Sequence, residues 1–174
     1  MIRKLLQNLF ANRNYKSKLS YLRRMGAHIG DGTRLISSVA ALGSEPYLIT
    51  IGKDCLISSN VFFFTHDGGV KVLNSLNYFE KKQDKVGPIV VGNNCFIGHG
   101  TIILPNVTIG DNCIVGAGSV VCKNVPANSV CAGIPAKVIC SIDTYYQKNA
   151  NSFFPTPTLP PLEKQKYLEN VFRK

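Results

Sequence analysis

The sequence of 174 residues lacks several features that mark large classes of proteins. It has no tryptophan, and no apolar run approaches the roughly 18 to 20 residues that a transmembrane helix requires. The short apolar start is broken by Arg3 and Lys4, too early for the core of a signal peptide. A C-x-x-C pair and a glycine-rich nucleotide fingerprint are also missing. We therefore expect a cytoplasmic protein without a membrane span.

Acidic residues are scarce, with ten Asp and Glu against twenty Lys and Arg, a formal net charge of +10. Such an excess can indicate a nucleic-acid-binding protein. However, residues 1–24 carry seven basic side chains and no acidic one, while the other 150 residues carry thirteen basic and ten acidic ones. No helix-turn-helix, zinc-finger or RNA-binding signature accompanies the charge. We expect no nucleic-acid partner, and a basic N-terminal segment on a nearly balanced body.

What the sequence does contain is a six-residue repeat. The aliphatic positions are Val91, Ile97, Ile103, Ile109, Val115 and Val121, preceded by the shorter runs Ile51, Ile57, Phe63 and Ile29, Leu35. Three positions after nine of these eleven residues stands Gly, Asn or Asp, which adopt left-handed backbone conformations at least cost, and a small or β-branched residue follows. The pattern predicts short strands joined by tight corners, three to a coil, with coils stacked as parallel strands about 4.8 Å apart. A period of six excludes an amphipathic helix.

Over roughly residues 20–140 these repeats resemble the hexapeptide-repeat acyltransferases, and segments 115–121 and 132–139 look like that family's last coils. The resemblance implies an all-β fold, a left-handed parallel β-helix with an excursion loop and short terminal helices. It also implies a homotrimer with active sites between adjacent prisms, and acetyl-CoA as donor. We divide the chain into a basic segment 1–24, expected to be helical, a catalytic β-helix 25–140, and an extension 141–174 with a proline-rich strap and a helix over 162–172.

The repeat breaks at two places, four extra residues near 43–46 and an excursion over 65–88. His66 and Asp67 stand at the root of the excursion, in the corner position and the small inward position. From spacing alone His66 is either a turn residue or a functional group. In the branch of the family that acetylates sugars of surface polysaccharides, which this segment resembles, a His here is the catalytic base. Asp67 and Glu45 are both candidates to orient its second ring nitrogen, and Glu45 could equally be a solvated loop charge.

A base of this kind suits acetyl transfer, because imidazole titrates near neutrality and can move the hydroxyl proton to the departing thiolate. We expect direct transfer in a ternary complex. By resemblance CoA lies between two prisms at the later coils, with lysines near its phosphates. The matching residues are Gly98, His99, Gly116, Ala117 and Gly118 for pantetheine, and Cys122, Lys123 and Lys137 nearer the nucleotide. The lysines could instead be solvated, and His99 could be inert.

The six cysteines predict neither a disulfide framework nor a metal site. Cys55, Cys95 and Cys113 fall in the small inward position, with Cys131 a candidate for the next member of the column. Free Cys packs as a small hydrophobe, and a reducing cytoplasm disfavours disulfides. The three His residues are scattered, so we expect no metal.

The function we expect is O-acetylation of a sugar hydroxyl in a surface or capsular polysaccharide or its precursor. The alternatives are acetylation of an antibiotic or a free small sugar and, in another class, a non-catalytic trimeric scaffold. The lysines of the excursion hint at an acidic glycan, although exposed lysines are usually only solubilising. The basic N-terminal segment could dock on its own trimer or rest on the inner face of the membrane as a peripheral contact.

Overall fold

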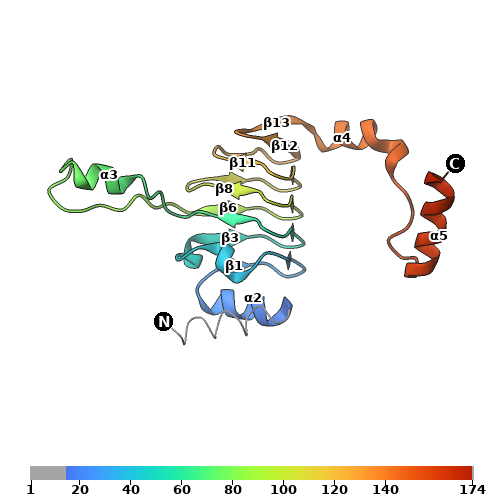
Figure 1. The fold of residues 1–174 in the computed structure, drawn as a ribbon, viewed down its shortest axis with the longest axis horizontal. Helices are drawn as coiled ribbons and strands as arrows, with labels where there is room; N and C mark the ends of the chain where they lie inside the picture. Colours follow the sequence, from blue (N-terminus) through green and yellow to red (C-terminus); the bar gives the residue numbers. More distant parts are fainter. Residues whose placement is uncertain (1–14, 174) are drawn as a thin grey trace. The chain divides into compact units, whose positions relative to one another are not determined.

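A computed structural model describes residues 15–173, which fall into two units that divide between residues 142 and 143. The larger unit is a stack of triangular coils, with one sheet on each side of the triangle (Figure 1). Sheet A contains β1 (His28–Ile29), β3 (Ile49–Ile51), β6 (Ile89–Val91) and β9 (Thr108–Ile109). Sheet B contains β2 (Arg34–Leu35), β4 (Leu56–Ile57), β7 (Phe96–Ile97), β10 (Ile114–Val115), β12 (Ser129–Gly133) and β13 (Ala136–Ser141). Sheet C contains β5 (Phe62–Phe63), β8 (Ile102–Ile103) and β11 (Val120–Val121).

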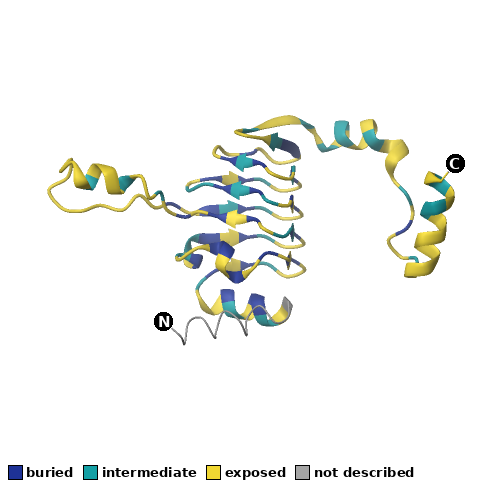
Figure 2. Ribbon diagram, viewed as in Figure 1, coloured by how far each residue is buried: buried dark blue, intermediate teal, exposed yellow. Residues whose placement is uncertain are grey.

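The aliphatic columns run unbroken through all three sheets. Ile51 pairs with Val91, Ile57 with Ile97 and Phe63 with Ile103, all in parallel register. These pairs join the coil before the excursion to the coil after it, so the insertion does not shift the register. The side chains are buried inside the triangle and form the core (Figure 2). The predicted parallel β-helix is confirmed.

The cysteines at the small inward position of the repeat also lie in the core. The Cys55 thiol donates to the carbonyl of Gly92 at 3.0 Å, and the Cys95 thiol donates to that of Gly110 at 3.1 Å. Burial raises the pKa of the Cys113 thiol, which keeps it protonated as a donor. All six cysteines are free thiols, so these three stabilise the stack by packing and weak hydrogen bonds.

The prediction that Cys131 is the next member of that column is wrong. Cys131 lies opposite Val115, in the aliphatic column. The cause is a shortened last coil, in which sixteen residues separate Thr108 from its partner Asn124 and Val125 bridges Ile109. Val125 is therefore an aliphatic position, and Asn124 is not among the corner residues with a positive φ.

A helix with basic side chains closes the first coil. Neighbouring coils exchange backbone hydrogen bonds in both directions, as from the N–H of Arg34 to the carbonyl of Cys55 and from the N–H of Asp54 to the carbonyl of Asp31. The first coil has no preceding coil, so its carbonyls on that side need other donors. Lys18, on α2 (Tyr15–Arg24), is buried, and its ammonium donates to the carbonyls of Leu35, Ile36 and Ser37 at 3.2, 3.1 and 2.7 Å. The helix expected over 1–24 is thus present from residue 15, and residues 1–14 lie outside the described part.

The segment that closes the last coil differs from the predicted one. Residues 132–139 were expected to continue the coils, but β13 turns back and pairs antiparallel with β12. With no further coil above it, β12 would otherwise expose an unpaired strand edge, and the returning strand covers that edge. Among the described residues, no helix is long and apolar enough to cross a membrane.

Two insertions interrupt the stack where the repeat predicted them. The first forms two short 3-10 helices, η1 (Val39–Leu42) and η2 (Pro46–Leu48), with Glu45 between them. The second is the excursion, an arm that projects from the prism and carries α3 (Val70–Ser75) (Figure 1). Its side chains are mostly exposed, unlike those of the coils (Figure 2).

The smaller unit follows β13. It contains α4 (Ile142–Asn149), which begins at the last residue of the larger unit, then η3 (Ala150–Ser152) and α5 (Pro161–Phe172). The last helix covers the range 162–172 that the sequence indicated. Phe154 packs edge-on against Tyr167 and Phe172, so aromatic contacts hold the strap to the helix.

Candidate functional site

The backbone of His66 is held by a short antiparallel ladder, which we call the neck (residues 65–67 and 85–87). His66 bridges Val86, while N–H groups of Asp67 and Gly87 donate to the carbonyls of Lys85 and Thr65, each at 2.8 Å. His66 is not among the residues with a positive φ, so it is not a left-handed corner residue. The turn interpretation, open on spacing alone, therefore does not account for His66.

The imidazole of His66 is oriented by Glu45. Its Nδ1 lies 2.9 Å from Oε2 of Glu45, and the Thr65 hydroxyl donates to the same oxygen at 2.6 Å. Thr65 is fully buried, whereas 44% of the His66 side chain is exposed. The four-residue insertion before η2 brings Glu45 to this edge of the stack, one coil below the neck. The ring is thus anchored on one side and open to solvent on the other.

Electrostatics fix which nitrogen of His66 is available. Hydrogen bonds from the Thr65 hydroxyl and from His66 hold the pKa of the Glu45 carboxyl below its ordinary value. An ionised carboxylate can only accept hydrogen bonds, so Nδ1 carries the hydrogen of this pair. In the neutral ring the lone pair is then on Nε2, which faces away from Glu45. The arrangement can accept a proton at Nε2 and stabilise the resulting imidazolium.

Asp67, the other candidate partner, does not contact the ring. Its carboxylate bonds to the Lys85 ammonium at 2.7 Å and to the N–H of Gly69 at 2.8 Å. The same two groups hold the pKa of the Asp67 carboxyl below its ordinary value. The side chain also fails to point inward as the repeat position predicted, because the chain has already left the coil. Asp67 therefore braces the two arms of the neck, and the open choice between Asp67 and Glu45 resolves to Glu45.

A groove of about 480 Å³ lies beside His66. One part of its wall is apolar and another is polar. The lining residues are Phe64, His66, Asp67, Gly68, Lys85, Leu104, Pro105, Asn106 and Cys122. Of the residues expected to contact CoA, Cys122 is the one that shares this groove. Sequence analysis did not single out Thr65 or Phe64; the only signal was that they flank the broken repeat.

The other expected CoA contacts lie elsewhere on the prism. Gly98, His99 and the segment 116–118 form the corner between sheets B and C, whereas His66 and Cys122 follow strands of sheet C on its other side. A Cβ at Gly98 would lie 2.5 Å from the nitrogen of Ala117, so close stacking alone requires glycine there. His99 Nδ1 contacts the Ser59 hydroxyl at 2.8 Å. A single prism does not bring these two groups of residues together.

The two lysines are exposed. Lys123 follows Cys122 at the corner between sheets C and A, and Lys137 lies on β13 opposite Ala132. No group of three or more His, Cys, Asp or Glu within residues 15–173 could hold a metal ion.

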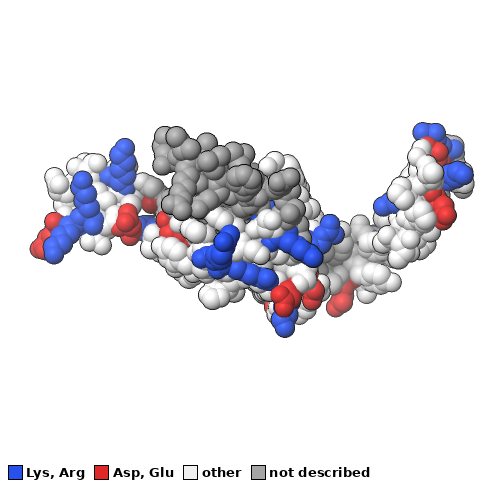
Figure 3. All heavy atoms as spheres, turned by 90° about the horizontal axis from the view of Figure 1, so that it is seen from below, with Lys and Arg blue, Asp and Glu red and all other residues white. Residues whose placement is uncertain are grey.

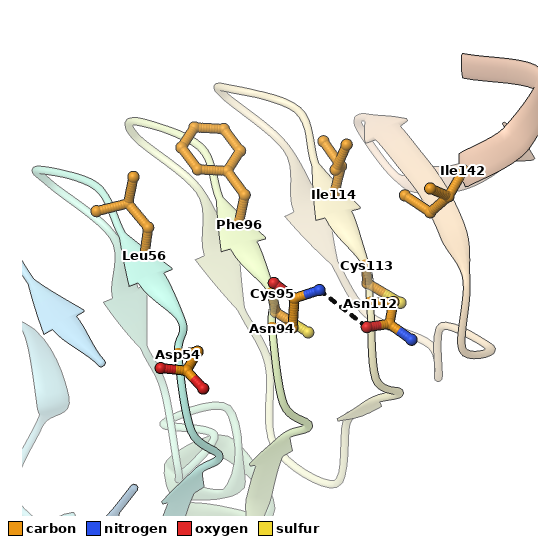
Figure 4. Close-up of a pocket in the computed structure, with 9 residues that line it drawn as sticks. All are labelled: Asp54, Leu56, Asn94, Cys95, Phe96, Asn112, Cys113, Ile114 and Ile142. Carbon is orange, nitrogen blue, oxygen red and sulfur yellow. Dashed lines mark hydrogen bonds between the residues drawn. The ribbon is translucent and has the colours of Figure 1, made fainter. Parts of the chain in front are cut away.

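A second hollow, of about 310 Å³, lies on the outer face of sheet B (Figure 4). Leu56, Phe96, Ile114 and Ile142 form an apolar row there, beside an amide contact from Asn94 to Asn112 at 2.9 Å. It contains none of the expected site residues and no histidine. Its lining is largely apolar and includes one carboxylate, Asp54.

Comparison with known proteins places these features in context. Residues 88–123 match the bacterial transferase hexapeptide family (six repeats). Protein CapG of Staphylococcus aureus is 46% identical over 157 residues, 88% of this chain and 88% of CapG. A galactoside acetyltransferase in complex with coenzyme A superposes with a TM-score of 0.62 at 25% identity, over 90% of this chain and 85% of that one. A maltose O-acetyltransferase from Clostridium difficile gives a TM-score of 0.50 at 28% identity, over 79% and 83%. The expected fold class, a left-handed parallel β-helix, is confirmed by these similarities.

Proposed function

The chain belongs to the hexapeptide-repeat bacterial transferases and is a CoA-dependent acetyltransferase, and from that premise we propose that it O-acetylates a sugar of a surface or capsular polysaccharide or its precursor. The observation that carries the reaction is the Glu45–His66 pair at the groove, with Nδ1 held at 2.9 Å and Nε2 free. The similarity to solved enzymes named maltose O-acetyltransferase and galactoside acetyltransferase supports a sugar hydroxyl as acceptor.

In the proposed reaction, Nε2 of His66 removes the proton of the acceptor hydroxyl as its oxygen attacks the thioester carbonyl. The ionised Glu45 stabilises the imidazolium, which then gives its proton to the departing CoA thiolate. Glu45 and Thr65 do not touch the substrate; they hold the ring. Acetyl passes directly from sulfur to oxygen, with no acyl-enzyme.

The donor would occupy a groove completed by a neighbouring prism. His66 and Cys122 lie on one side of sheet C, and Gly98, His99 and 116–118 lie on the other. A homotrimer would bring one side of a prism against the other side of its neighbour. Lys123 and Lys137 would then supply positive charge for the nucleotide phosphates. Light scattering should give three times the chain mass of 19.0 kDa; a monomer would contradict the shared groove.

The test is thiol release from acetyl-CoA with a panel of bacterial polysaccharides and their sugar precursors. We expect acceptor-dependent release that falls by about 10²–10⁴-fold in His66→Ala. His28→Ala, an exposed histidine on β1, is the matched control and should retain full activity. Unchanged release in His66→Ala would contradict the assigned base, and no release with any acceptor would favour the scaffold.

Two further arms separate the alternatives. Maltose and a simple galactoside belong in the panel because the similar solved enzymes are named for them; preference for these over every polysaccharide precursor would favour a free small sugar. A burst of CoA release without acceptor would indicate an acyl-enzyme and contradict direct transfer.

A further inference from the structure

We propose that the groove beside His66 selects an uncharged sugar ring, seated against Phe64, over a sugar that carries a carboxylate. This inference rests on the proposed function, since it names the class of acceptor for the same site. It also replaces the acidic glycan that the lysines of the excursion suggested.

The first argument is the charge around the reacting nitrogen. Glu45 and Asp67 are ionised carboxylates, and Lys85 is the one ammonium among the lining residues of the groove. Lys85 is already paired with Asp67 at 2.7 Å. With His66 neutral, as a base must be, these groups sum to one negative charge. A carboxylate on the acceptor would be repelled by this negative charge.

The other lysines of the excursion do not change this balance. Lys71, Lys81 and Lys82 are exposed and do not line the groove. Basic and acidic side chains are interspersed on the excursion in the space-filling view (Figure 3). Its basic composition therefore does not create a positive surface at His66.

The second argument is the shape of the walls. Phe64 is 42% exposed and is held by parallel stacking on Phe62, with ring centroids 6.2 Å apart and planes 9° apart. Leu104 and Pro105 continue this apolar wall, while the Asp67–Lys85 pair and Asn106 make the polar one. A pyranose has an apolar C–H face and a rim of hydroxyls. An aromatic platform facing hydrogen-bonding groups matches both surfaces.

Cys122 gives a readout of groove occupancy that does not depend on turnover. Its thiol is exposed and lines the groove, whereas Cys55, Cys95, Cys113 and Cys131 are buried and Cys140 is half-buried outside it. A sugar bound against Phe64 should slow alkylation of Cys122 by iodoacetamide. Labelling at Cys140, followed by peptide mass spectrometry in the same sample, serves as the internal reference.

The experiment compares methyl β-D-galactopyranoside with its uronate, methyl β-D-galactopyranosiduronate, on the full chain without CoA, because the CoA thiol would itself react with iodoacetamide. The neutral sugar should halve Cys122 labelling at a concentration about tenfold lower than the uronate. Asp67→Asn removes one negative charge and frees Lys85, so it should reduce that ratio to near one. Lys81→Met lies outside the groove and should leave the ratio unchanged. Phe64→Ala should abolish protection by the neutral sugar.

The outcomes are distinct. Equal protection by both sugars, stronger protection by the uronate, or no protection by either would overturn the inference. Protection by the neutral sugar without acetyl transfer to any acceptor would leave the inference standing and contradict the proposed function. Acetyl transfer that favours uronates would support the function and overturn the inference.

Discussion

The coils and the excursion belong to the same unit but differ in burial and in regularity. In the coils, aliphatic side chains are buried in register and each strand pairs with the next. The excursion interrupts this order, and its helix α3 has no buried residue. Yet its neck fixes the backbone of His66, and the smaller insertion supplies Glu45. The regular part thus provides stability, and the two irregular parts provide the reactive groups. This division can be tested by matched substitutions.

The largest effect should come from the core. Phe63, at the end of β5, is 0% exposed, whereas Phe79 of the excursion is 39% exposed. Phe63→Ala should lower the free energy of unfolding by about 3–5 kcal/mol, because it leaves a cavity between stacked coils. Phe79→Ala should change it by less than about 1 kcal/mol. Denaturant unfolding followed by circular dichroism measures both, and similar losses would contradict the comparison.

The cap of the first coil should come next. Lys18→Met removes three donors and leaves buried carbonyls without partners. We expect a loss of about 1–3 kcal/mol in the free energy of unfolding. Lys16→Met, an exposed lysine of the same helix, is the control and should have almost no effect. Equal, small effects of the two would mean that the Lys18 contacts do not stabilise the stack.

A smaller effect is expected at Thr65. Thr65→Val keeps the buried volume but removes the hydroxyl that donates to Glu45 at 2.6 Å. We expect kcat/KM to fall about tenfold, ~1.4 kcal/mol in transition-state stabilisation, and the free energy of unfolding to fall by about 1 kcal/mol through the lost hydrogen bond. Thr65→Ser restores the donor and should restore the rate. A stability loss that Ser does not rescue would indicate packing instead.

The same variant has a predicted pH signature. Hydrogen bonds from Thr65 and His66 lower the folded-state pKa of Glu45, so this carboxyl contributes stability at higher pH and loses it as pH falls through that pKa. Removing the Thr65 hydroxyl raises the pKa of Glu45. The loss of stability on acidification should therefore begin at a higher pH in Thr65→Val than in the wild type. Superimposable plots of the free energy of unfolding against pH would show that the hydroxyl does not act through Glu45.

The smallest effect is expected for the neck ion pair. Lys85 and Asp67 are bonded at 2.7 Å, but both side chains are substantially exposed, and exposed pairs contribute little. Lys85→Met should shift the thermal midpoint by no more than about 2 °C, and this shift should shrink further at high salt. A larger, salt-independent loss would show that the neck is part of the stable frame.

Much of the coil architecture can be predicted from the sequence, because a repeat of six residues determines which positions stack on one another in successive coils. The partners of Ile51, Ile57 and Phe63 could be predicted across the excursion by phase alone. Counting in steps of six residues gives the wrong partner where a coil changes length, which is why Cys131 was assigned to the wrong column. The repeat also does not indicate whether the strand after the last coil runs parallel or antiparallel to it, so the antiparallel β13 was not predicted.

The site was predictable in part for the same reason. His66 stands where the pattern breaks, and a break is visible in sequence. The choice between Asp67 and Glu45 depends on where an irregular loop carries a side chain, and no periodicity describes that. Thr65 was missed because it stands one position before the corner, where the repeat carries residues of different kinds such as Lys53 and Asn93, so its bond to Glu45 leaves no mark in the pattern.

The stacking of the coils through backbone hydrogen bonds has a consequence for self-association. Because every inner coil bonds to a coil on each side, the first coil would present carbonyls without donors and the last coil a free strand edge. Two such ends are complementary, and open ends of this kind favour end-to-end growth into filaments. Lys18 occupies the carbonyls at one end, and β13 covers the edge at the other. The terminal segments thus keep the coil stack at a finite length.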